Sequence, residues 1–96
     1  MRAITIPKFG DYNVLSLQEL PVPEPGPSDV TIDVAYAGVN YAEVLFRKGV
    51  VPDLPLPFVP GIEVSGTIRA VGEDVSGLHV GQPVAALTIV DGGGYA

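Results

Sequence analysis

Glu63 is the carboxylate of this sequence whose setting most favours chemistry. It lies in the run Pro60–Gly72, where two sets of residues alternate with a period of two: Ile62, Val64, Ile68 and Ala70 against Glu63, Ser65, Thr67 and Arg69. The glycines of this run allow the backbone to bend, bulge or approach another group closely. The pattern predicts a strand with one face in the core and Glu63 on the wall of an active site. The alternative is that Glu63 is an ordinary solvated strand residue.

Asn40 is the second candidate, because its side-chain amide carries both hydrogen-bond donors and an acceptor. Asn is also a preferred helix N-cap, and Glu43 follows three residues later at the spacing of a capping box. We expect a helix over Tyr41–Lys48 that ends at Gly49. Four residues of this helix should share one side: Tyr41, Val44, Leu45 and Lys48. Taken alone, the pattern makes Asn40 a helix cap.

Three further side chains of the same helix are candidates for a pocket. Tyr41 is either an ordinary packed aromatic residue or a cleft residue whose hydroxyl meets a polar partner. Phe46 and Arg47 fit a plain helix end, where the macrodipole favours a cation, and Arg47 could alternatively face the mouth of a pocket. His79 is the only imidazole and lies near a turn, so it is assigned no role.

The first elements can be placed from alternation and turn signals. Met1–Ile6 and Val14–Leu20 are expected to form a hairpin. The four prolines of Pro21–Pro27 prevent regular strand pairing, so this segment should cross the surface as an extended strap. A half-buried strand should follow, with four residues on its buried face: Val30, Ile32, Val34 and Tyr36. A last strand is expected to start at Gln82-Pro83 and to continue through the apolar Val84–Val90.

Composition narrows the class of protein. The 96 residues suit one domain, and 47% hydrophobic with 17% charged residues indicates a globular chain. The formal net charge of −6 argues against nucleic acid as a partner, and the absence of Cys excludes disulfides and a thiolate nucleophile. Neither a signal peptide nor an apolar stretch of ~20 residues is present, which makes a membrane partner unexpected and a cytoplasmic location the default.

Together, Val39–Glu43 and the triplet Gly61-Ile62-Glu63 resemble the catalytic domain of the medium-chain dehydrogenase/reductase superfamily. Zinc alcohol dehydrogenases of that family carry Cys where Asn40 stands and Gly-His-Glu where this triplet stands. Ile62 cannot coordinate a metal, and a neutral Asn is a poor replacement for a thiolate. Ala42 also replaces a hydroxyl residue of their proton relay. The chain therefore resembles the zinc-independent branch of quinone oxidoreductase-like and enoyl-reductase-like enzymes.

The resemblance implies a fold, a reaction and a site. The fold would be mainly β, a GroES-like partly open β-barrel portion with one short α-helix, residues 1–96 being the N-terminal part of the catalytic domain. A Rossmann domain, absent from this chain, would bind most of the NADPH, and no zinc would be needed. The intact enzyme would be a homodimer that reduces quinones or α,β-unsaturated carbonyls. Asn40 and Tyr41 would be catalytic, Asn40 would also contact the cofactor, and the substrate pocket would include Tyr41, Phe46, Arg47 and Glu63.

A GroES-like barrel can also serve in proteins that are not enzymes. The alternative function is therefore a stand-alone interaction module, for instance a chaperonin cap. Such a cap needs a long mobile loop with an apolar tip. The apolar segment Val50–Pro60 carries four prolines, whose stiffness favours the rim of a pocket over a flexible tether.

Overall fold

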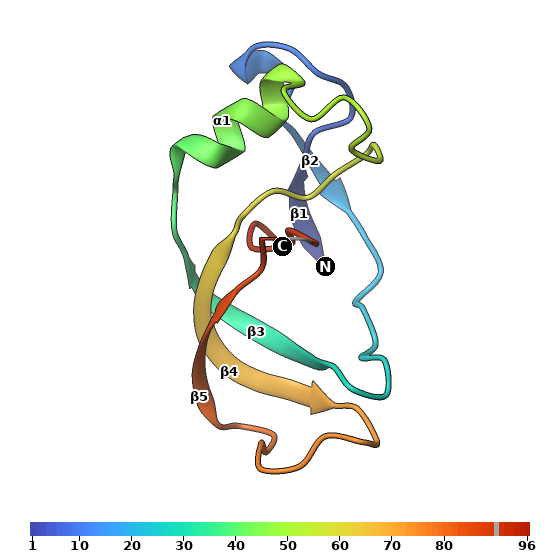
Figure 1. Ribbon diagram of the computed structural model, residues 1–96, viewed down its shortest axis with the longest axis vertical. Coiled ribbons are helices and arrows are strands. Elements are labelled where there is room, and N and C mark those ends of the chain that lie inside the picture. The colour runs from blue at the N-terminus through green and yellow to red at the C-terminus, as the bar shows by residue number, and fades with distance from the viewer. Residues whose placement is uncertain (90) are drawn as a thin grey trace.

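The computed structural model describes residues 1–89 and 91–96, and within these it is mainly β with one α-helix (Figure 1). Two antiparallel sheets, β1-β2 and β3-β4-β5, are joined by long connections. The elements are β1 (Arg2–Thr5), a 3-10 turn (Tyr12–Val14), β2 (Ser16–Glu19), β3 (Val30–Ala37), α1 (Tyr41–Lys48), β4 (Glu63–Val71) and β5 (Pro83–Leu87). The predicted mainly β class with a single short α-helix is confirmed. No helix of the described residues is long and apolar enough to cross a membrane.

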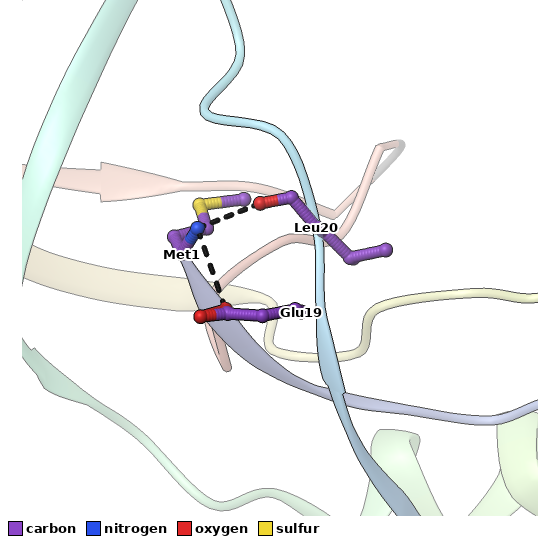
Figure 2. A network of polar contacts seen from close by, with 3 residues as sticks. All are labelled: Met1, Glu19 and Leu20. Atoms are coloured by element: carbon purple, nitrogen blue, oxygen red, sulfur yellow. Dashed lines mark hydrogen bonds and ion pairs between the residues drawn. The ribbon is translucent and has the colours of Figure 1, made fainter.

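The expected N-terminal hairpin is present, with shorter strands than predicted. Its register runs from Arg2 opposite Glu19 to Thr5 opposite Ser16. Figure 2 shows the contacts that join the two strands at the end opposite the turn. The Met1 amine donates to the Leu20 carbonyl oxygen at 2.7 Å and lies 3.7 Å from Glu19 Oε2. Because the Glu19 side chain is 75% exposed, this ion pair contributes at most about 1 kcal/mol.

The strand β4 alternates as predicted. Val64 and Ile68 are buried, whereas Glu63, Thr67 and Arg69 are exposed. The strand needs a glycine at Gly66. A Cβ there would collide with the backbone carbonyl oxygen of Asp33 on the neighbouring strand β3. The two strands therefore approach closely at this point, as the glycine pattern indicated.

The expected alternation of β3 is wrong at Tyr36, the last of the four residues predicted on its buried face. Tyr36 is 78% exposed, although it was predicted on the buried face. Val34 pairs with Gly66 and Tyr36 pairs with Ser65, so two steps along β3 match one step along β4. This bulge turns Tyr36 onto the face that carries Ser65 and Glu63.

The proline strap lies against the far end of the β3–β4 pair. Pro21–Pro27 contains no strand or helix, and the Pro27 carbonyl accepts a hydrogen bond from the Asp74 N–H at 2.8 Å. In Figure 1 the strap runs from β2 to the start of β3, beside the three-stranded sheet. β5 ends at Leu87, earlier than expected, and Val90 of the predicted strand lies outside the described residues.

The helix has the predicted bounds, and its buried residue is Glu43. Asn40 has the extended backbone of an N-cap, and Gly49 takes the left-handed conformation at φ 86° that stops the helix. Tyr41 is 69% exposed and Lys48 is exposed, whereas Glu43 is buried. The helix turns the Glu43 carboxylate inward, where backbone N–H groups bind it.

Candidate active site

The structure brings Asn40 and Glu63 together although they are 23 residues apart in sequence. Asn40 Nδ2 donates to Glu63 Oε1 at 3.2 Å. Asn40 caps α1, and Glu63 is the first residue of β4, so the contact links the helix to the strand. The Asn40 amide is half-buried and the Glu63 carboxylate is exposed. The pair offers ligands one remaining amide N–H and several acceptor oxygens.

Gly38 makes room for this pair, and sequence reasoning missed it. A Cβ at Gly38 would lie 2.6 Å from Glu63 Cδ and 2.7 Å from Glu63 Cγ. The Gly38 N–H also donates to the Glu63 carbonyl oxygen at 3.1 Å. The Glu63 side chain therefore folds back over a residue without a side chain. The sequence signal for this role is the position of Gly38, two residues before the capping Asn40.

A shallow hollow of about 440 Å³ lies on the sheet face beside Glu63. It is lined by Tyr36, Ala37, Gly38, Glu63, Val64, Ser65, Ala85, Ala86 and Leu87. Glu63 pairs with Leu87 across β4 and β5, and Leu87 is 72% exposed. Tyr36 and Leu87 are exposed apolar walls of this hollow, beside the Glu63 carboxylate.

A larger hollow, of about 1010 Å³, lies elsewhere, between the proline strap and the sheet. Its lining includes Val22, Val30, Ile32, Ile89 and the charged Asp33 and Arg69, but none of the predicted site residues. The Asn40–Glu63 pair therefore lies outside the larger hollow.

Tyr41 lies next to the pair, whereas Phe46 and Arg47 contact residues outside it. Tyr41 opens α1 with an exposed side chain. The Phe46 ring meets the Phe58 ring edge to face, with centroids 5.7 Å apart. Arg47 Nη1 donates to the Gly10 carbonyl oxygen at 2.7 Å, which ties the helix to the N-terminal hairpin connection. The pocket roles of these three residues stay predictions.

Glu43 is a buried carboxylate with two donors. Its side chain is 7% exposed. Oε2 accepts a hydrogen bond from the Asn40 backbone N–H at 2.9 Å, which is the bond predicted from the capping-box spacing. Oε1 accepts a second one from the Ile62 backbone N–H at 3.2 Å. Sequence reasoning did not find the second bond, because it joins segments 19 residues apart.

The glycine-tyrosine turn near the end of the chain packs behind this carboxylate. Gly61 has φ 107°, and a Cβ there would lie 2.6 Å from Gly94 Cα. The Tyr95 N–H donates to the Pro60 carbonyl oxygen at 3.0 Å. Burial raises the pKa of the Tyr95 hydroxyl above its usual value of 10.0, and the negative charge of Glu43 adds to this rise. Sequence reasoning did not place Tyr95 in the site.

In residues 1–89 and 91–96, acidic and His side chains form no group of three or more that could hold a metal ion. At the two positions that the resemblance gives to zinc ligands stand Asn40, whose amide binds Glu63, and Ile62, which has no metal-binding group. Zinc independence stays a prediction that rests on the residues themselves.

Comparison with known proteins identifies the relatives of this chain. It is 42% identical to quinone oxidoreductase of Lama guanicoe over 95 residues, which are 97% of this chain and 29% of the relative. It is 40% identical to the synaptic vesicle membrane protein VAT-1 homolog of Rattus norvegicus over 90 residues, 91% of this chain and 22% of that protein.

A solved structure agrees with these sequence matches. Escherichia coli quinone oxidoreductase complexed with NADPH superposes with a TM-score of 0.85 at 26% identity, over 91% of this chain and 27% of the enzyme. The chain thus spans less than a third of the length of these relatives. The alcohol dehydrogenase GroES-like domain matches residues 26–95, which is most of the chain. The predicted fold is confirmed, and the chain belongs to the GroES-like domain family of the medium-chain dehydrogenases and reductases.

Proposed function

We propose that the protein containing this chain is a zinc-independent, NAD(P)H-dependent reductase that transfers hydride to quinones or α,β-unsaturated carbonyls. The observation that carries the proposal is the Asn40–Glu63 pair beside an apolar hollow. The 42% identity to a quinone oxidoreductase over 97% of the chain supports the same reaction class. A quinone is itself a carbonyl conjugated to a carbon–carbon double bond, so the two substrate classes need the same protein groups.

Asn40 would stabilise the substrate oxygen on which negative charge develops. One of its amide N–H groups binds Glu63, which leaves the second N–H free to donate to that oxygen. The Tyr41 hydroxyl, exposed at the first position of α1, is a second donor for the same oxygen. A well-oriented donor of this kind lowers a reaction barrier by about 2.7–4 kcal/mol.

The residues present fit one end of a nicotinamide cofactor. When bound, NADPH supplies the hydride. The Asn40 side-chain oxygen remains as an acceptor for an N–H group of the nicotinamide carboxamide. The net charge of −6 and the lack of a Gly-rich strand-turn-helix motif give no place for its phosphates, so another domain would bind most of the cofactor. NADPH in preference to NADH, a homodimeric assembly and a cytoplasmic location are parts of the same proposal.

Zinc independence follows from three replaced residues, Asn40, Ala42 and Ile62. We expect no stoichiometric zinc after dialysis against a chelator, because a thiolate and an imidazole are missing from the expected ligand set. Metal analysis of the dialysed protein tests this. One tightly retained zinc per chain would overturn the assignment to the zinc-independent branch.

A reductase is favoured over the chaperonin-cap function. The family that matches most of the chain is the alcohol dehydrogenase GroES-like domain, and the relatives include quinone oxidoreductases. The Val50–Pro60 segment is also fixed to the hairpin, since Ile6 and Phe58 exchange backbone hydrogen bonds of 2.7 and 3.1 Å. A cap would need this segment to be mobile.

Steady-state kinetics on the whole protein test the proposal. Asn40→Ala should lower kcat/KM for NADPH-dependent reduction of a quinone or an enone by ~10-fold to 10³-fold. His79→Ala is the control, because His79 is exposed in the connection between β4 and β5 and should leave turnover unchanged. If Asn40→Ala only lowers the melting temperature and turns over normally, Asn40 is a helix cap and the proposed site is wrong.

A further inference from the structure

Glu43 connects the two backbone segments that carry the candidate pair. Its Oε2 binds the N–H of Asn40, the residue whose amide reaches Glu63. Its Oε1 binds the N–H of Ile62, which directly precedes Glu63. One carboxylate therefore fixes the backbone at Asn40 relative to the backbone beside Glu63.

Both oxygens are needed for this connection. An ionised carboxylate accepts hydrogen bonds at each oxygen, whereas the amide of Gln has one acceptor oxygen and one NH₂ donor group. The NH₂ group cannot bind a backbone N–H, so Gln at this position would lose one of the two bonds. Asp keeps both acceptors, but its side chain is one methylene shorter and spans less distance between the segments.

The surroundings of Glu43 keep its position narrowly defined. The side chain is 7% exposed, and its charge raises the pKa of the Tyr95 hydroxyl, behind burial as the main cause. Gly61 and Gly94 pack backbone against backbone beside it. Buried charged groups persist when hydrogen bonds satisfy them, which the two N–H donors do here.

We propose that Glu43 is a positioning residue that holds the Asn40 amide and the Glu63 carboxylate in contact. Its catalytic consequence rests on the proposed reductase function, but the positioning itself does not. Glu43 acts through Asn40 and Ile62 and needs no contact with substrate.

NMR of the side-chain amide of Asn40 tests the positioning in this chain. The change Glu63→Gln should shift the Asn40 NH₂ signals, because it alters their acceptor. In a Glu43→Gln background the same change should produce less than half of that shift. Glu73→Gln is the matched control, since Glu73 is exposed in the turn after β4, and it should leave the full response. An equal response in the Glu43→Gln and Glu73→Gln backgrounds would show that Glu43 stabilises the fold without positioning the pair.

A second variant and the unmodified chain keep the proposal testable if Glu43→Gln does not fold. Glu43→Asp should speed hydrogen exchange of the Ile62 N–H at least 10-fold, because the shorter side chain cannot reach both donors. In the unmodified chain, scalar coupling through the hydrogen bond should link the Ile62 N–H to the carboxyl carbon of Glu43. Absence of that coupling would overturn the proposal.

Kinetics of the whole protein add the functional consequence. Glu43→Gln should lower kcat about 10-fold with a smaller change in KM, because a displaced donor affects the transition state more than substrate binding. Unchanged kcat per folded molecule would overturn the catalytic consequence. If the unmodified whole protein reduces neither quinones nor enones, the proposed function fails, whereas the NMR results still decide the positioning.

Discussion

Two carboxylates of this chain, Glu43 and Asp33, each bind a partner distant in sequence, but one carboxylate is buried and the other is exposed. Glu43 is 7% exposed and binds two backbone N–H groups. Asp33 lies on the exposed sheet face, where its Oδ1 is 3.1 Å from Arg69 Nη1 and the two side chains are 59% and 50% exposed. Water competes for the Asp33–Arg69 pair and screens its charges, whereas fixed donors replace water around Glu43. The same kind of contact can therefore define a site in one place and contribute little in another.

Removing the buried Glu43 carboxylate should change the free energy of unfolding more than any other substitution considered for this comparison. Glu43→Ala should lower the free energy of unfolding by about 2–4 kcal/mol, because two partly buried N–H groups lose their acceptor. Chemical denaturation of the variant and the unmodified chain measures this. The matched change Glu73→Ala, on the exposed turn, should stay within about 0.5 kcal/mol. A loss at Glu43 no larger than at Glu73 would mean that water satisfies the two N–H groups.

A smaller effect is expected at the residue that gives Glu63 its space. Gly38→Ala should cost about 1 kcal/mol, because the added Cβ meets the Glu63 side chain, which can swing into solvent. The same change should separate Glu63 from Asn40 and shift the Asn40 side-chain amide signals in an NMR spectrum. Unchanged signals would show that the chain accommodates the methyl group without moving Glu63.

The exposed ion pair should contribute least to stability at neutral pH. A double-mutant cycle with Asp33→Ala and Arg69→Ala should give a coupling of about 0.2–1 kcal/mol, the usual range for exposed ion pairs. The coupling should weaken further in high salt, since both charges are in contact with solvent. A salt-independent coupling above about 2 kcal/mol would contradict the contrast with Glu43.

Tyr95, which lies near the buried Glu43, should affect stability only at alkaline pH. Its pKa is raised in the folded chain by burial and by Glu43, so its contribution to stability is complete below the unfolded pKa of about 10. The contribution is lost as pH rises through the folded pKa. Tyr95→Phe should therefore reduce the loss of stability above pH 10. Melting temperatures measured from pH 7 to pH 11 would detect the difference.

The sequence by itself determined the elements whose signals are local. Asn40, Glu43 and Gly49 marked the ends of α1 correctly, because capping and left-handed glycine act within one helical turn. The period-2 pattern placed Val64 and Ile68 in the core, since strand geometry sends alternate side chains to opposite faces. Asn40 and Glu63 were both identified as candidates from residue type and resemblance.

Tertiary structure decided how those residues meet. The bulge opposite Ser65 and Gly66 moved Tyr36 to the exposed face, and it arises from pairing with β4 rather than from the sequence of β3. The second hydrogen bond of Glu43 and the burial of Tyr95 join segments that are distant in sequence. Such contacts depend on register and close backbone approach, as at Gly38 and Gly61. Local propensity carries no information about them, because the partner of each group is fixed only when the chain has folded.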